Sequence, residues 1–192
     1  MKIPLPVLGV LLAGGVSRRM GQDKCLLQCG GRPLWEHQLA TLAGVYPNEE
    51  LPLAVASPKK PIWLPRNISW VPDAGTGPLA AIVAAMESSK SGLILVLAID
   101  LPEMTSEYLS ELLAGCAIDC GAVPHGDVGF EPVAAVFPAN AASIEREYLL
   151  SGRRDLQGWV KDLQARGRIL PRKIKPAERV LFTNWNRPND LR

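Results

Sequence analysis

Small and basic residues lie close together near the start of the chain, where residues 12–24 read LAGGVSRRMGQDK. Gly14 and Gly15 have no Cβ, so the backbone there can approach a ligand and present N–H groups to an anion. Arg18, Arg19 and Lys24 add positive charge to the same segment. The segment therefore predicts a binding site for a nucleotide or another phosphate ester. The alternative is an ordinary glycine turn with charged surface residues.

Two familiar phosphate loops do not fit this segment. A Walker A loop has four residues between its glycines and then Gly-Lys-Ser/Thr. Here five residues separate Gly15 from Gly21, and Cys25 stands where the metal-binding hydroxyl would follow Lys24. A Gly-x-Gly-x-x-Gly dinucleotide fingerprint is also missing from the segment.

Two aspartates follow predicted strands and could complete such a site. Asp100 ends an unbroken apolar run, residues 93–99, and a carboxylate at the end of a buried strand needs a partner or a metal ion. Mg²⁺ is typically held by one or two carboxylates plus substrate phosphates, so we favour a metal role for Asp100 over a helix or turn cap. Asp73 could accept a hydrogen bond from a ribose hydroxyl or a base N–H, or form an Asx-turn towards Gly75.

Two asparagines near the C-terminus, Asn184 and Asn186, are spaced to point the same way from an extended segment. They could present amides to one ligand, although by themselves they favour a turn.

The elements that must position these residues alternate between strands and helices. The predicted strands are 7–12, 53–56, 68–71, 93–99, 121–124, 133–137 and 180–183. The predicted helices are 33–42, 79–88, 106–114, 142–150 and 156–166, with Thr105 or Ser106 as the cap of the third. This alternation predicts α/β architecture: a single domain over residues 1–192, Rossmann-like, with a mostly parallel sheet in a three-layer α/β/α arrangement. Ligands of such sheets lie outside the carboxyl ends of the strands.

Composition limits the partners of the chain. Of its 192 residues, 47% are hydrophobic and 21% are charged, as in ordinary globular proteins, and the net charge is +2. This charge is too small to indicate a nucleic-acid or membrane surface, and the basic cluster 166–175 is interpreted as a solvated face. Cysteines at 25, 29, 116 and 120 could bind zinc, but reduced thiols in a cytoplasmic protein are the better interpretation.

The 12–24 motif resembles the signature of the molybdenum cofactor guanylyltransferases, within the wider group of sugar-nucleotidyltransferase-like proteins. Further segments match in order and rough spacing: Pro33-Leu-Trp-x-His37, Gly77-Pro-Leu-Ala80, Asp100-Leu-Pro102 and Asn184-x-Asn-x-Pro188. The resemblance implies a nucleotide-diphospho-sugar transferase type of fold and a nucleotidyltransferase activity. In that reaction GTP and molybdopterin give the guanine dinucleotide cofactor and pyrophosphate, with Mg²⁺ required. It also implies transient contact with proteins that deliver the cofactor or mature molybdoenzymes.

Carried over to this chain, the resemblance implies a role for each matched residue. The nucleotide would contact residues of the glycine segment and three side chains beyond it: Leu12, Ala13, Gly14, Gly15, Arg18, Lys24, Ser57, Asp73 and Asp100. Lys24, Arg19 and Asp100 would act in catalysis, with Asp100 as the metal ligand. The pterin side would be formed by Pro78, Leu79, Asn184 and Asn186.

Two positions depart from the family pattern. Ser57 stands in a region where the family often has an asparagine or another polar residue that contacts the nucleotide. Ala81 replaces the glycine of the family's Pro-Leu-Ala-Gly, which adds a methyl group where backbone could approach the ligand.

Three other functions share parts of this pattern. A cytidylyltransferase acting on the same cofactor tends to have Ala-Ala-Gly where this chain has Ala13-Gly14-Gly15, so the sequence favours guanine. The short chain argues against a sugar-phosphate nucleotidyltransferase. Lys24 and Asp100 argue against a non-catalytic nucleotide-binding partner of the same fold.

Overall fold

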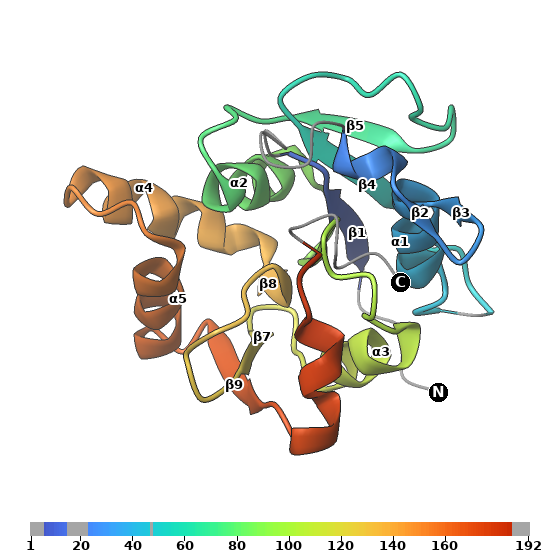
Figure 1. The fold of residues 1–192 in the computed structure, drawn as a ribbon. Helices are drawn as coiled ribbons and strands as arrows, with labels where there is room; N and C mark the ends of the chain where they lie inside the picture. Colours follow the sequence, from blue (N-terminus) through green and yellow to red (C-terminus); the bar gives the residue numbers. More distant parts are fainter. Residues whose placement is uncertain (1–5, 15–22, 47, 186–192) are drawn as a thin grey trace.

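A seven-stranded, mostly parallel sheet forms the middle of the molecule (Figure 1). This computed structural model describes residues 6–14, 23–46 and 48–185. The strands lie in the order β5-β4-β1-β6-β8-β7-β9. Their bounds are β1 Val7–Leu12, β4 Leu53–Ser57, β5 Ser69–Pro72, β6 Leu93–Ala98, β7 Gly121–His125, β8 Ala134–Pro138 and β9 Ile169–Lys173. Only β8 among these strands runs antiparallel to its neighbours, which are β6 and β7.

The path of the chain reverses direction across the sheet next to β1. After β1 the chain passes through α1 (Leu34–Ala43) to β4 and β5, and it then returns through α2 (Pro78–Ser88) to β6 on the other side of β1. The two helices cover opposite faces, because α1 packs in one core cluster and α2 in the other. Ligands of open α/β sheets bind at such a reversal, beyond the carboxyl ends of the strands.

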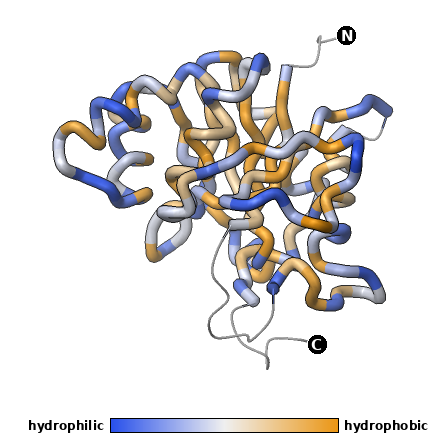
Figure 2. The backbone as a smooth tube through the Cα atoms, turned by 90° about the horizontal axis from the view of Figure 1, so that it is seen from above, coloured by the Kyte–Doolittle hydropathy of each residue, from blue (hydrophilic) through white to orange (hydrophobic). Residues whose placement is uncertain are grey.

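Strand β6 supplies apolar side chains to both faces of the sheet. Leu93, Leu95 and Leu97 point into the layer with α1 and α3 (Ser106–Ala114), whereas Ile94 and Val96 point into the layer with α2. The second layer also contains α4 (Ala142–Leu150) and α5 (Leu156–Ala165). Figure 2 shows many apolar residues in the middle of the molecule and many hydrophilic ones on its outer turns. The three-layer prediction is therefore confirmed.

Local signals explain where several helices begin. The Thr105 side chain accepts a hydrogen bond from the backbone N–H of Tyr108, so Thr105 is the residue that caps α3. Asp155 caps α5 in the same way, through the N–H of Gly158. Pro78 occupies the first turn of α2, where its missing N–H is not needed.

The C-terminal part of the sheet differs from the prediction. The expected strand 180–183 is wrong: these residues belong to a 3-10 helix, η3 (Pro176–Phe182), and the extended Thr183 that follows it. The last strand is instead β9, which pairs in parallel with β7 alone at the edge of the sheet. An edge strand can contain a proline and basic residues, as β9 does with Pro171, Arg172 and Lys173. Because β9 therefore lacks the apolar run of a buried strand, the sequence pattern does not predict it.

Four short elements were also not predicted. They are η1 (Lys24–Leu26), the two-stranded pair of β2 (Gln28–Cys29) and β3 (Arg32–Pro33), and the turn η2 (Ala139–Ala141). The β2–β3 pair takes up the first residue of the helix expected over 33–42, so α1 starts at Leu34.

Candidate active site

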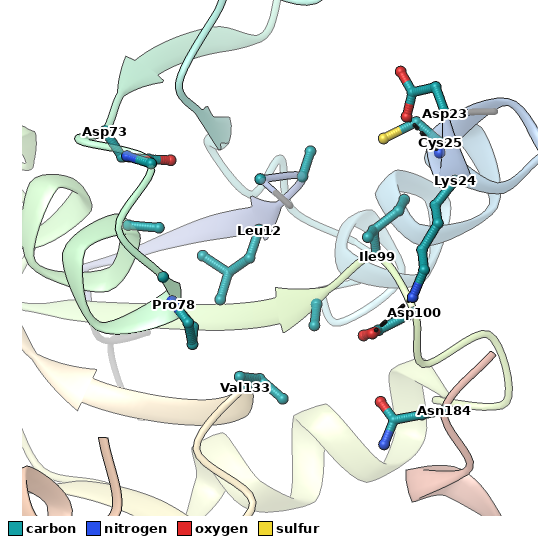
Figure 3. A pocket seen from close by; sticks show the side chains of 16 residues that line it. Leu12, Asp23, Lys24, Cys25, Asp73, Pro78, Ile99, Asp100, Val133 and Asn184 are labelled. Carbon is teal, nitrogen blue, oxygen red and sulfur yellow. Dashed lines mark hydrogen bonds and ion pairs between the residues drawn. The ribbon is translucent and has the colours of Figure 1, made fainter. Parts of the chain in front are cut away.

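A pocket of about 350 Å³ opens at the carboxyl ends of β1 and β6, where the chain reverses direction. This volume lies within the usual range for small-molecule sites. Its lining brings together eight predicted residues: Leu12, Ala13, Gly14, Lys24, Asp73, Pro78, Asp100 and Asn184. Figure 3 shows Asp73 and Pro78 on one side of this pocket and Asp100 with Lys24 on the other, with Leu12 between them.

Lys24 and Asp100 form an ion pair at one end of the pocket. The Lys24 Nζ lies 3.4 Å from the Asp100 Oδ2, and their side chains are 18% and 25% exposed. Lys24 belongs to η1, and the preceding Asp23 caps this turn by accepting a hydrogen bond from the Cys25 N–H. The pair places a cation and a metal-compatible carboxylate side by side, at the edge that the strand pattern predicts.

Asp73 divides its carboxylate between a turn and the pocket. One oxygen, Oδ1, accepts a 2.6 Å hydrogen bond from the Gly75 N–H, which is the predicted Asx-turn. The other, Oδ2, is buried, and no residue in the described part of the chain donates to it. It lies 3.4 Å from the position that a Cβ on Gly14 would occupy. A buried carboxylate oxygen at the wall of a pocket needs a donor, and a ligand can supply it.

The N-terminus of α2 opens into the same pocket. Gly77, the residue that precedes the helix, has φ +122°, ψ 178°, a combination essentially confined to glycine. A Cβ built at Gly77 would meet no atom within 4 Å in the described structure, so the space beside it is open. Because the first N–H groups of a helix lack partners within the helix, this end can receive an anion.

Asn184 reaches the pocket on the C-terminal strap, defined here as residues 176–185. The Trp185 N–H donates a 2.9 Å hydrogen bond to the Asp100 carbonyl, and the Trp185 side chain is buried. Farther back, the Phe182 ring packs edge-on against Tyr108 of α3. The strap therefore carries Asn184 to the same end of the pocket as Asp100, as Figure 3 shows.

The basic residue Arg172 anchors the strap. Its guanidinium forms two hydrogen bonds with the Glu178 carboxylate, of 2.9 and 3.1 Å, and lies 4.2 Å from the centre of the Tyr108 ring. Burial alone would raise the pKa of Glu178, but hydrogen bonds from Arg172 and from the Lys175 N–H hold it below its ordinary value. Within the basic cluster 166–175, which the sequence suggested is a solvated face, Arg172 is thus ion-paired with Glu178 and supports the strap.

Two predicted site residues do not line the pocket. The Ser57 hydroxyl donates to the Lys59 carbonyl and accepts from the Trp70 indole N–H, so this side chain is engaged at the end of β4. Leu79 points into the core beneath α2. Gly15, Arg18, Arg19 and Asn186 lie outside the described residues.

Other residues of the lining were not predicted. Val133 enters because β8 starts at this edge of the sheet: the strand itself is predicted over 133–137, but its antiparallel direction is not. Ala81 lines the pocket from the first turns of α2, so the residue that departs from the family pattern does belong to the site wall. Asp23 could have been found from the preference of aspartate for the position before a helical turn.

The cysteines do not form a metal centre in the described part of the chain, which contains no group of three or more His, Cys, Asp or Glu residues arranged for a metal ion. Burial raises the pKa of the Cys25 thiol far above its ordinary value and that of Cys116 to about 12. Such thiols stay protonated and unreactive at neutral pH.

A single carboxylate nevertheless fits one kind of metal binding. Mg²⁺ commonly uses one or two protein carboxylates together with substrate phosphates rather than a complete protein cage. Asp100 has the necessary oxygen ligand at the pocket wall, and a metal ion would share this carboxylate with the Lys24 ammonium. The donor set is therefore suitable for a metal ion that arrives with a nucleotide.

Fold and pocket together indicate an α/β nucleotidyltransferase, with the pocket over the carboxyl ends of parallel strands and the Lys24–Asp100 pair at one end of it. The MobA-like NTP transferase domain matches residues 9–167, and the chain belongs to this family. The resemblance inferred from the sequence motifs is thereby confirmed.

Individual relatives agree along nearly the whole chain. A probable molybdenum cofactor guanylyltransferase from Opitutus terrae is 34% identical, over 95% of this chain and 91% of its own length. One from Deinococcus radiodurans is 33% identical, over 97% and 93%. The crystal structure of molybdopterin-guanine dinucleotide biosynthesis protein A from Archaeoglobus fulgidus superposes with a TM-score of 0.73 at 25% identity, covering 96% of this chain and 94% of that one.

Proposed function

We propose that the chain, as one nucleotidyltransferase domain over residues 1–192, transfers GMP from GTP to molybdopterin and releases pyrophosphate. The observation that carries this proposal is the Lys24–Asp100 pair in the pocket of a MobA-like chain. The names of the relatives supply the guanine base and the pterin acceptor.

In this reaction a phosphate oxygen of the pterin attacks the α-phosphorus of GTP. The new P–O bond forms as the bond from the α-phosphorus to the pyrophosphate oxygen breaks. A phosphate monoester is already ionised at pH 7, so the protein does not need a general base. Its tasks are to hold donor and acceptor in line and to offset the charge of the phosphates.

Each end of the pocket has a separate task in this proposal. Asp73 Oδ2 accepts a hydrogen bond from the nucleoside, beside the backbone of Ala13 and Gly14. Lys24 and the N-terminus of α2 bind phosphate oxygens, with Arg18 and Arg19 assisting on the triphosphate and the leaving pyrophosphate. Asn184, Asn186 and Pro78 contact the pterin.

The metal proposed is Mg²⁺, with Asp100 as its protein ligand. When bound, such an ion neutralises phosphate charge and so favours departure of pyrophosphate. Cytoplasmic localisation is proposed from the reduced thiols. Among the residues that the structure describes, no helix has both the length and the apolar composition needed to cross a membrane.

Thermal denaturation with Mg-GTP, Mg-CTP, Mg-ATP and Mg-UTP tests the choice of nucleotide. We expect Mg-GTP alone to raise the midpoint strongly, because a ligand at a hundredfold excess over its Kd stabilises a fold by about 2.7 kcal/mol. Stabilisation by Mg-CTP instead would indicate a cytidylyltransferase. Equal effects of all four nucleotides would contradict a guanine-selective site.

A further inference from the structure

Helix α1 holds the segment that carries Asp100, although none of its residues lines the pocket. The side chain of Gln38, in the middle of α1, is fully buried. Its Nε2 donates one hydrogen bond to the Ala98 carbonyl, at 3.1 Å, and another to the Leu101 carbonyl, at 2.8 Å. These two carbonyls stand on either side of Asp100 in the chain.

The orientation of the Gln38 amide follows from its partners. Both partners are carbonyl oxygens, which only accept hydrogen bonds, so the NH₂ group must face them. The opposite atom, Oε1, is buried without a donor among the described residues. A buried polar atom without a partner lowers stability, whereas an apolar residue of similar size would avoid this loss. Packing alone therefore does not explain glutamine at this position.

His37 holds the same segment one residue farther on. Its Nε2 lies 2.9 Å from the Pro102 carbonyl and must donate to it, which leaves Nδ1 to accept from Arg32 at 3.3 Å. Three hydrogen bonds from neighbouring residues of α1 thus hold the backbone from residue 98 to residue 102.

The start of α1 is joined to the other half of the ion pair. The Leu34 N–H donates a 2.7 Å hydrogen bond to the Leu27 carbonyl, directly after the η1 turn that carries Lys24. Helix α1 is consequently a common support for Lys24 and Asp100. These connections join α1 to the chain beside both members of the 3.4 Å ion pair.

From these contacts we propose that Gln38 and His37 are positioning residues for the metal-binding carboxylate. They act through the backbone on both sides of Asp100 and touch neither nucleotide nor acceptor. The inference rests on the proposed function, because it assumes that Asp100 binds the cation that accompanies the nucleotide.

Binding of Mn²⁺ in the presence of GTP, followed by electron paramagnetic resonance, tests the proposal without turnover. Gln38→Met removes both donors and keeps the length of the side chain. We expect the Mn²⁺ concentration for half-saturation to rise about tenfold or more, as is typical when a group that orients a metal ligand is lost. His37→Phe, at a less buried position, should raise it by a smaller amount and serves if Gln38→Met fails to fold.

Thr41→Val is the matched control. Thr41 is a buried polar residue of the same helix, and its hydroxyl bonds only within α1 in the described structure, to the His37 carbonyl. We expect Thr41→Val to leave Mn²⁺ affinity within about twofold of the parent, even if urea unfolding shows a comparable loss of stability. An equal weakening by Thr41→Val would make the effect merely structural and would overturn the proposal.

The experiment distinguishes failure of the positioning role from failure of the metal role of Asp100. If the parent protein binds Mn²⁺ with GTP and both α1 variants bind it equally well, the positioning role is wrong and the proposed function stands. If the parent protein takes up no Mn²⁺ with GTP, the metal role of Asp100 and the positioning role fall together.

Discussion

Lys24 and Asp100 form the ion pair on which the proposed chemistry depends. Each was predicted from its place after a strand: Lys24 from the glycine segment after β1 and Asp100 from the end of β6. Strands β1 and β6 pair in parallel and end together, and the two side chains meet beyond that edge at 3.4 Å. Ser57 also ends a strand, but its hydroxyl bonds to Lys59 and Trp70 instead. The sequence locates a strand end, but it does not show which way a short side chain turns there.

Replacing Lys24 with alanine should lower the rate of guanylyl transfer by about 10²–10³-fold, because a preorganised cation next to the phosphates is lost. Lys60→Ala, in the exposed loop after β4, is the control for loss of one positive charge. Steady-state rates of pyrophosphate release measure both variants. A loss of less than about threefold for Lys24→Ala would remove Lys24 from the catalytic site.

Asp73→Asn separates the two tasks of this carboxylate. The asparagine oxygen can still accept from the Gly75 N–H, so the turn and the thermal stability should persist. The atom at the Oδ2 position becomes an NH₂ donor when that turn is kept, so it can no longer accept a hydrogen bond from a nucleoside N–H or O–H. We expect the KM for GTP to rise about 10- to 100-fold, the value of a hydrogen bond to a charged group. An unchanged KM would show that Asp73 serves the turn alone.

At the scale of elements, strands with strong apolar runs can be predicted from the sequence, whereas the edge strand β9 cannot. Strand β6 is buried on both faces, so its pattern is unmistakable. In β9 only Ile169 is buried, and the rest of the strand looks like a polar loop. The apolar residues Val180 to Phe182 suggested a strand, but Pro176 and the Lys175–Glu178 capping contacts favour a short helix.

Arg172→Met should loosen the C-terminal strap while leaving the nucleotide end intact. It removes the two hydrogen bonds to Glu178 and keeps an apolar stem against Tyr108. We expect the strap to open more easily by about 1–2 kcal/mol, seen as faster hydrogen exchange in residues 176–185. The KM for molybdopterin should rise and that for GTP should not. Lys173→Met, on the same strand, is the control, and equal exchange in both variants would contradict the anchoring role.

The same contact predicts how acid affects the strap. The pKa of Glu178 is lowered in the folded protein, so its ionised form contributes stability that is complete above the pKa of the unfolded chain. That contribution is lost as the pH falls through the lower pKa of the folded state. Hydrogen exchange of the strap, corrected for the intrinsic rate, should therefore increase below about pH 4. In Arg172→Met the increase in hydrogen exchange at acid pH should be much smaller. An unchanged increase would show that another titrating group causes it.

At the scale of the whole molecule, the pocket lies where the path of the chain reverses direction across the sheet next to β1. The sequence predicts only part of this arrangement. Alternating strands and helices predict a three-layer arrangement with a parallel sheet. Because ligands of such sheets bind outside the carboxyl ends of the strands, the pattern also predicts the edge at which the site lies. This pattern predicts neither the antiparallel direction of β8 nor the path of the C-terminal strap back across the sheet, because both depend on contacts between distant segments. Asn184 was therefore predicted from the family resemblance, whereas its route to Asp100 became clear only in the structure.

Guanylyl transfer itself is the most direct test of the function proposed for this pocket. The purified protein is incubated with Mg²⁺, molybdopterin and GTP labelled at the α-phosphate, and the labelled dinucleotide and pyrophosphate are measured. We expect equal amounts of both products from GTP, little product from CTP, and no Mg²⁺-dependent turnover in Asp100→Asn. Transfer from CTP in preference to GTP, or an unchanged Mg²⁺ titration in Asp100→Asn, would contradict the proposed function or the metal role of Asp100, respectively.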